Sequence, residues 1–248
     1  IQTGQNATVN WTVANTGSAA TVGNWIDRIT ILNVTTGQTI ASGDVAYDAA
    51  ANGAIAAGAS STNRFFTFRV PDGAVGVGQL RVTVTSDIGN QISEFNPSGT
   101  GESNNSASAT GESVLGSYPE LSVTSVVVPP TATFGAPFMV SWSVLNSGNA
   151  TLTNPISDRL YLSLDSTLDG SDRLLATVPA GSFLPLSPGA SYINGTVVIP
   201  PLDAAIFGGQ YRIIVVSDAL GQQFELDESN NNGLSPQISI AVPPLPDL

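Results

Sequence analysis

The hydrophobic pattern of the chain consists mainly of short stretches in which apolar and polar residues alternate. In residues 8–13 (TVNWTV), Val9, Trp11 and Val13 alternate with Thr and Asn, and residues 140–144 (VSWSV) repeat the pattern. Successive side chains of a β-strand point to opposite faces of the sheet. This period of two therefore predicts a half-buried strand with its Trp on the core face.

Other strand candidates lie between clear turn signals. They are residues 81–85, 159–164, 191–199, 210–217 and 238–240. Turn residues separate them at 146–148 (Asn-Ser-Gly), 188–189 (Pro-Gly) and 208–209 (Gly-Gly). Good helix formers never gather at the 3.6-residue spacing of an amphipathic helix. About seven short strands in each stretch of roughly 120 residues predict an all-β, immunoglobulin-like antiparallel β-sandwich.

The chain contains an internal repeat with an offset of 131 positions, the distance from Trp11 to Trp142. At this offset residues 4–17 align with residues 135–148. Further pairs follow in chain order: Asp27 with Asp158, Gly58 with Gly189, Asp87 with Asp218, and Glu94 with Glu225. A Glu-Ser-Asn-Asn run then occurs in both copies, after a short insertion in the first. Ordered matches along most of the chain predict two tandem domains of one fold.

The repeat sets the domain boundaries that we predict. The first copy spans residues 1–114 and begins at its second strand, and the second copy spans residues 120–245. Residues 115–119 (LGSYP) are the predicted linker. Pro119-Glu120-Leu121 opens the second copy, and residues 246–248 (Pro-Asp-Leu) repeat this pattern as the predicted start of a following repeat. We therefore interpret the chain as an excerpt from a tandem array.

Composition narrows the classes of function. The 248 residues include no Cys and no His, which excludes disulfides, cysteine nucleophiles, His-dependent triads and most zinc sites. A formal net charge of −12, with only 7 Lys and Arg, argues against nucleic acid and anionic membranes as partners, because both require clustered cations. No apolar run approaches the roughly 20 residues that span a bilayer. A glycosidase needs two carboxylates about 5–10 Å apart; Asp and Glu are present, but no cleft is visible from the sequence, and we expect no enzymatic activity.

Acidic clusters are the candidate cation sites, since calcium takes six to eight oxygen ligands from carboxylates, amides and carbonyls. One predicted loop of copy two carries Asp165, Asp169 and Asp172. A second group follows the strand that ends near position 216, and its members are Asp218, Glu225, Asp227, Glu228 and Asn230. Asp, Asn and Ser also cap turns by bonding to nearby backbone. For the Glu-Ser-Asn-Asn run we predict a structural turn first and a cation ligand second.

Several motifs follow one another in a fixed order. They are Pro-Glu-Leu at 119–121, Val-x-Trp-x-Val at 140–144, Asn-Ser-Gly at 146–148, and the segments 157–163, 165–172, 209–213 and 227–231. Together they resemble the cell-adhesion-related domain found in bacteria, CARDB, over both copies. The first copy departs from the pattern at residues 33–37 (NVTTG), where copy two has its Asp-rich loop. The resemblance implies an immunoglobulin-like sandwich in a large secreted or surface-anchored bacterial protein, with no catalytic residues to carry over.

Three hypotheses of function remain. The first is a non-catalytic extracellular adhesion or spacer module in a stalk, monomeric in isolation, with neighbouring repeats and a cell-surface glycan or protein as partners. The second is a carbohydrate-binding module that stacks a sugar on Trp25 or Tyr161. The third is the protomer of an extracellular filament or matrix, in which the edge left by the missing first strand accepts a strand from another chain.

Overall fold

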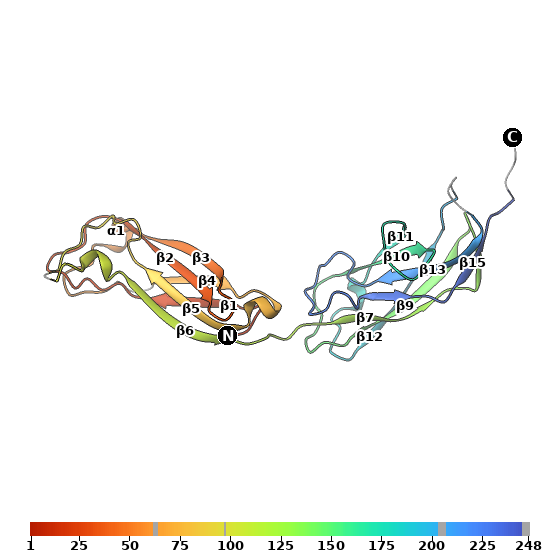
Figure 1. Cartoon of the computed structure of the whole chain (residues 1–248), viewed down its shortest axis with the longest axis horizontal. Helices are drawn as coiled ribbons and strands as arrows, with labels where there is room; N and C mark the ends of the chain where they lie inside the picture. Colours follow the sequence, from red (N-terminus) through yellow and green to blue (C-terminus); the bar gives the residue numbers. More distant parts are fainter. Residues whose placement is uncertain (62–63, 97, 203–206, 245–248) are drawn as a thin grey trace, which may run out of the picture. The chain divides into compact units, whose positions relative to one another are not determined.

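The computed structural model describes residues 1–61, 64–96, 98–202 and 207–244, and these residues form two all-β units (Figure 1). Unit 1 comprises Ile1–Gly116 and unit 2 comprises Ser117–Leu248. Each unit is made almost entirely of antiparallel sheet, so the predicted all-β class is confirmed. The expected start of another repeat at residues 246–248 lies outside the described residues.

In the described ranges, helical structure is limited to short single turns. Their bounds are Ala49–Asn52 for the α-helix α1, and Gly73–Gly76, Gly101–Ser103 and Gly181–Phe183 for the 3₁₀ turns η1, η2 and η3. Within the described ranges, no helix has the length and apolar character that a membrane span requires.

Unit 1 is a sandwich of a four-stranded sheet and a two-stranded sheet. Its strands are β1 (Asn6–Trp11), β2 (Trp25–Asn33), β3 (Gln38–Tyr47), β4 (Arg64–Arg69), β5 (Gly78–Thr85) and β6 (Ser106–Ser113). One sheet has the order β3-β2-β5-β6, and the other pairs β1 with β4. Ile29 and Ile31 lie two positions apart on β2, so both point inward, where they pack with Phe68, Val70 and Leu80.

Unit 2 repeats this plan with additional strands. They are β7 (Leu121–Val127), β8 (Thr131–Thr133), β9 (Phe138–Asn146), β10 (Ser157–Ser163), β11 (Arg173–Pro179), β12 (Ser191–Val198), β13 (Gly209–Val216), β14 (Asn232–Leu234) and β15 (Ile238–Ala241). One sheet has the order β11-β10-β13-β15-β8 with β14 paired to β13, and the facing sheet has the order β12-β9-β7. The predicted strands of both copies coincide with β1, β5, β9, β10, β12, β13 and β15 to within a few residues.

Both units bury an aspartate beneath their core tryptophan. Trp11 Nε1 donates to Asp27 Oδ2 in unit 1, and Trp142 Nε1 donates to Asp158 Oδ2 in unit 2, each at 2.8 Å. Both aspartates are fully buried. The sequence aligned these aspartates in the repeat, and the structure shows why each unit has one: a buried indole N–H needs an acceptor.

The two aspartates have different second partners. In unit 1 the Arg64 guanidinium forms a buried ion pair with Asp27 at 2.6 Å. In unit 2 the position opposite the Trp on the neighbouring strand is occupied by Asn194, and the Tyr192 hydroxyl donates to Asp158 instead. Burial raises the pKa of Asp158 to about 6, although the hydrogen bonds from the indole and the phenol oppose the rise.

Candidate functional site

The Asp-rich loop between β10 and β11 is built from local turn contacts. Asp165 accepts the N–H of Thr167 at 2.7 Å, and Asp169 accepts both the N–H and the hydroxyl of Ser171 at 2.7 Å. Asp172 in turn accepts the N–H of Asp169 at 2.8 Å. The Ser171 hydroxyl, followed by its N–H, lowers the pKa of Asp169. These contacts are those of carboxylates that cap a turn.

Two members of the second acidic group also cap turns. Asp218 has a φ of 43° and accepts the N–H groups of Gln222 and Gln223 at 2.9 and 2.8 Å. Asp227 accepts the N–H and the hydroxyl of Ser229 at 2.9 and 2.6 Å. Asp218 therefore fixes the turn that follows β13, and Asp227 fixes the turn within the Glu-Ser-Asn-Asn run.

Glu225 and Glu228, together with the neighbouring Asn231, form a hydrogen-bonded cluster that we call the Glu lock. Glu228 Oε1 accepts the N–H of Glu225 at 3.2 Å, and Asn231 Nδ2 donates to Glu225 Oε1 at 3.1 Å. The other oxygen of Glu225 accepts the N–H of Leu121, the first residue of β7. Burial raises the pKa of Glu225 to about 8, and the bonds from Leu121 and Asn231 oppose that rise. The lock thus positions the buried carboxyl of Glu225 so that it binds the first residue of the edge strand β7, which lies 104 residues earlier in the sequence.

Glu120, immediately before β7, is held by the same loop. Its carboxylate accepts the N–H groups of Leu226 and Asp227 at 3.0 and 3.3 Å and the Asn230 Nδ2 at 2.7 Å. Its own N–H donates to Asn146 Oδ1 at 3.2 Å. The run predicted as a structural turn is therefore a turn that also recognises the start of a strand.

The described parts of the chain contain no group of three or more His, Cys, Asp or Glu side chains that could hold a metal ion. The carboxylates proposed as ligands instead accept hydrogen bonds from backbone and side-chain groups around them. Calcium binding by either acidic group stays a prediction, and a melt in calcium and in chelator decides it.

Unit 1 contains the same lock. Glu102 Oε1 accepts the N–H of Glu94 at 2.8 Å, as Glu228 does for Glu225. In the amide orientation that gives both of its polar atoms a partner, Asn105 donates to Glu94 Oε2 at 2.9 Å. The lock is thus a property of both repeats.

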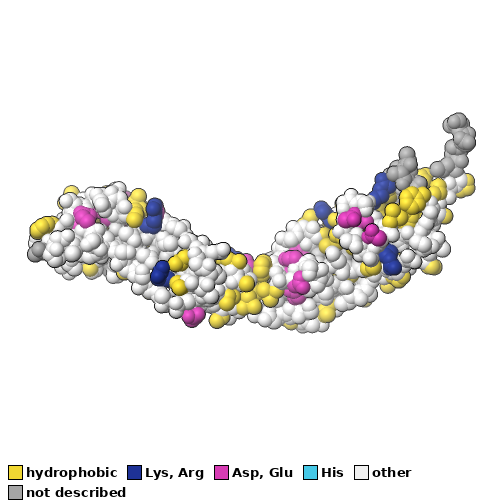
Figure 2. All heavy atoms as spheres, viewed as in Figure 1, with side chains coloured by type: hydrophobic (Ala, Val, Ile, Leu, Met, Phe, Trp, Pro, Cys, Tyr) yellow, Lys and Arg dark blue, Asp and Glu magenta, His cyan; other side chains and the backbone are white. Residues whose placement is uncertain are grey.

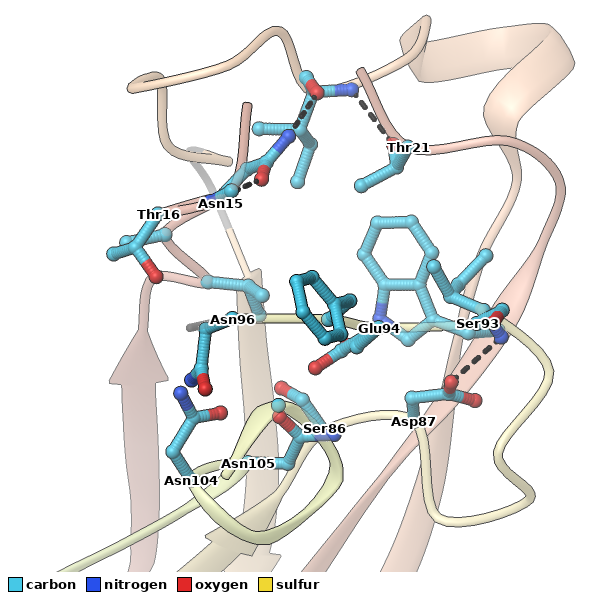
Figure 3. A pocket seen from close by; sticks show the side chains of 18 of the residues that line it. Asn15, Thr16, Thr21, Ser86, Asp87, Ser93, Glu94, Asn96, Asn104 and Asn105 are labelled. Carbon is cyan, nitrogen blue, oxygen red and sulfur yellow. Dashed lines mark hydrogen bonds between the residues drawn. The ribbon is translucent and has the colours of Figure 1, made fainter. Parts of the chain in front are cut away.

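What unit 1 does not have, among its described residues, is a strand in the place of β7. There β1 pairs with β4 alone, whereas the equivalent β9 is flanked by β12 and β7. Trp11 on β1 is half-buried, whereas Trp142 on β9 is 1% exposed. Beside the segment that continues from the end of β1, residues 11–21, lies a pocket of about 520 Å³ (Figure 3).

Polar side chains gather around this pocket. Figure 3 shows Glu94, Asn96, Asn104 and Asn105 around one hollow, with Asn15 on its opposite side. Burial, and to a smaller degree the charge of the neighbouring Glu102, raise the pKa of Glu94. A half-buried carboxyl, several amides and an apolar floor can together bind a ligand that carries both backbone-like donors and apolar side chains.

Sequence reasoning did not identify this pocket as a site. The available signal is the alignment of Glu94 with Glu225 in the repeat. Spacing alone cannot reveal a partner as distant as Leu121, so the acidic residues predict calcium ligands instead. The sugar platform proposed for Trp25 is wrong: Trp25 is 2% exposed, and its ring stacks on Tyr47 with 3.9 Å between centroids. Tyr161, the other candidate, is half-buried on β10.

No family model and no curated protein matches the chain. Among solved structures, the chain is similar to a crystal structure of a CARDB domain from Pyrococcus furiosus in complex with di-metal ions. That match has 19% identity and a TM-score of 0.37, and it covers 51% of this chain and 96% of that one. A solution structure of that CARDB domain has 21% identity and a TM-score of 0.36, with 50% of this chain and 96% of that one covered.

A more extended but weaker match is red sea bream transglutaminase. It has 12% identity and a TM-score of 0.29, and it covers 96% of this chain and 29% of that one. Similarities of this strength transfer no function to the chain.

Proposed function

We propose that the chain is a non-catalytic adhesion and spacer module, made of tandem immunoglobulin-like units in the stalk of a secreted or surface-anchored protein. The observation that carries the proposal is the duplication itself. Each unit has its own core, its own buried Trp–Asp contact and its own Glu lock. Units built in this way fold one by one and can be added without redesign of their neighbours.

The surface also suits a solvent-exposed array. On the face shown in Figure 2, charged side chains occur singly or in small groups, and uncharged atoms cover most of the rest. The formal net charge is −12, so copies of the chain repel one another, which disfavours their association.

Single-molecule pulling on the intact chain tests the spacer role. Two separate unfolding events are expected, each releasing roughly 40 nm of chain at about 3.5 Å per extended residue. A single event that releases the whole length at once would contradict the proposal, because the units would then unfold as one body.

Screening the intact chain on glycan arrays tests the adhesion role against the carbohydrate alternative. Saturable glycan binding that disappears in Tyr161→Ala and persists in Trp25→Phe would show that the chain is a carbohydrate-binding module. Weak binding that Tyr161→Ala leaves unchanged would support the adhesion and spacer proposal.

A further inference from the structure

We propose that the free edge of β12 in unit 2 is a self-association site, at which two copies of the chain pair antiparallel through β12 about a two-fold axis. The β12-β9-β7 sheet of one copy then continues into the same sheet of the other. β12 lies within the chain, between β11 and β13. The inference concerns unit 2 alone and does not depend on the spacer role.

The first support is the unpaired backbone of β12. In the described ranges β12 pairs with β9 alone. The Ala190 carbonyl accepts the last N–H of β9 at 2.9 Å. Backbone groups alternate in direction along a strand, so those of Ile193, Gly195 and Val197 point away from β9. The Gly195 N–H donates to Asn194 Oδ1 at 2.8 Å, which agrees with this direction. Such an edge offers donors and acceptors to an added strand.

The second support is the apolar character of this edge. Ile193 and Val197 point outward from β12 and are 73% and 56% exposed. Met139, opposite Val197 on β9, is 58% exposed. The outward position between Ile193 and Val197 is Gly195, so no side chain there keeps a neighbouring strand away. The edge therefore exposes apolar surface that a second strand would cover.

The third support is the absence of the devices that normally protect an edge strand. Charged residues, prolines and bulges prevent such edges from pairing with other chains. The edge strands β3, β6 and β11 each carry a charged residue, namely Asp44, Glu112 and Arg173. β12 has no charged residue and no proline, and all eight of its residues pair with β9 without a bulge.

The fourth support is the lack of charge on the rest of this face. The residues of β9 and β7 that point outward are serine or apolar: Met139, Ser141, Ser143 and Leu145 on β9, and Ser122, Ser125 and Val127 on β7. The net charge of −12 repels a second copy at a distance, but none of these side chains adds to the repulsion at contact. A basic partner would gain no ion pair here, which favours a second uncharged strand as the occupant.

The sequence of β12 is also complementary to itself. In an antiparallel pair centred on Gly195, Ile193 lies opposite Val197 of the second copy, and the reverse pair forms on the other side of the axis. Cross-strand apolar pairs of this kind stabilise a sheet. The backbone of Ile193 and Val197 gains new hydrogen bonds, while the Gly195 N–H exchanges its bond to Asn194 for one to the second copy.

The interface is small. The eight residues of β12, at about 3.4 Å each, give an edge of about 27 Å. The contact therefore falls below the roughly 800 Å² per partner of a standard interface. We expect a weak dimer with a Kd on the order of 100 µM, so the chain is monomeric at low concentration.

Sedimentation equilibrium of the intact chain, from micromolar to millimolar concentration, tests the proposal. We expect a monomer–dimer equilibrium that strengthens with added salt, because salt screens the repulsion between two acidic copies. Val197→Asp and Ile193→Arg should each weaken dimerisation about tenfold or more, because each places an unpaired charge in an apolar contact.

The double variant, Ile193→Arg with Val197→Asp, tests the register. In the antiparallel pair each new Arg faces the new Asp of the other copy, so dimerisation should return toward that of the unmodified chain. It should now weaken with salt, which screens the new ion pairs. In a parallel pair, or in a non-specific apolar contact, the two changes would combine. A double variant that dimerises less than either single variant would therefore overturn the proposal.

Thr67→Asp in unit 1 is the matched control. Thr67 is exposed on β4 and pairs with Thr8 as Val197 pairs with Met139. This variant should dimerise as the unmodified chain does, and circular dichroism melts establish that every variant is folded. A chain that stays monomeric at millimolar concentration in high salt would overturn the proposal. So would equal weakening by Thr67→Asp, or association that continues beyond the dimer, because a two-fold pair is closed.

Discussion

Glu225 in unit 2 and Glu94 in unit 1 occupy the same lock and have different surroundings. Glu225 is buried beneath β7 and accepts the N–H of its first residue, whereas Glu94 is half-buried at the wall of an open pocket. The loop geometry is retained in both cases. In unit 2, where β7 is present, the Glu225 carboxyl binds the N–H of Leu121. The comparison teaches that the Glu-Ser-Asn-Asn run forms a turn and also positions a carboxyl that holds the start of a strand.

The units also differ in how they neutralise a buried carboxyl. Asp27 is paired with the Arg64 guanidinium and also accepts the indole N–H groups of Trp11 and Trp25, whereas the side-chain donors to Asp158 are neutral Trp and Tyr groups. A buried ion pair depends on both partners being present, whereas a buried carboxyl without a cation depends on pH. The two units should therefore respond to different perturbations.

The largest expected effect is that of Arg64→Ala. It leaves Asp27 buried without its cation and frees the carbonyls of Val45 and Ala46, to which Arg64 also donates. Unit 1 should lose about 3–5 kcal/mol of unfolding free energy. Asn194→Ala, at the equivalent position of unit 2, should cost less than about 1 kcal/mol, because the Asn194 Nδ2 has no partner among the described residues.

Urea denaturation followed by tryptophan fluorescence measures both, since Trp142 is the one Trp of unit 2. Equal losses of unfolding free energy in the two variants would show that Asp27 does not depend on a cation any more than Asp158 does, which contradicts the account.

The glycine pair gives the next largest contrast. Gly148→Ala should destabilise unit 2 by about 2–3 kcal/mol, because the new methyl overlaps the backbone that leads into β7. Gly17→Ala should change the stability of unit 1 by less than about 0.5 kcal/mol, because a Cβ there meets only Asn15 Oδ1 at 3.2 Å. Thermal melts of the two variants measure the difference, and equal losses would contradict this contrast between the two glycines.

A smaller effect should follow pH. The folded-state pKa values of Asp158 and Glu225 are raised to about 6 and about 8, so protonation favours folded unit 2. This stabilisation is complete below about pH 4 and is lost as pH rises through 6 and then 8. The melting midpoint of unit 2 should fall by several degrees from pH 4 to pH 8.

Asp158→Asn should make the fall between pH 4 and 6 shallower and leave the fall between pH 6 and 8, which Glu225 governs. In contrast, Asp27→Asn should lower the stability of unit 1, because Arg64 then has no charged partner. A midpoint of unit 2 that rises with pH over this window would show that Asp158 and Glu225 do not govern the response.

The smallest expected effect is that of calcium. Asp165, Asp169, Asp172 and their counterparts in the second group already accept local hydrogen bonds, so calcium should raise the midpoint of unit 2 by no more than about a degree or two. Ligation at 100 times the Kd would instead add about 2.7 kcal/mol. Melts in calcium and in chelator, repeated with Asp169→Asn, separate these outcomes.

Part of the fold could be predicted from alternation, because a period of two identifies strands such as β1, β9 and β13 and their core faces. Other strands, such as β2, β4 and β7, were not predicted. The repeat offset of 131 then pairs the strand of Trp11 with the strand of Trp142, because both show the same alternation. Ion pairs and strand contacts such as Arg64 with Asp27, or Glu225 with Leu121, could not be predicted, since they join residues 37 and 104 positions apart. Local sequence determines which turns form, whereas the sheet order determines which side chains meet.

The most direct test of the account is amide hydrogen exchange by NMR on the intact chain and on its Glu225→Ala variant. Leu121 donates its N–H to Glu225, and β7 pairs with β9. The account predicts that the Leu121 amide is protected in the unmodified chain and exchanges faster in the variant, while amides at the centre of β10 keep their protection. A Leu121 amide that is equally protected in both chains would contradict the claim that the Glu lock holds the start of β7.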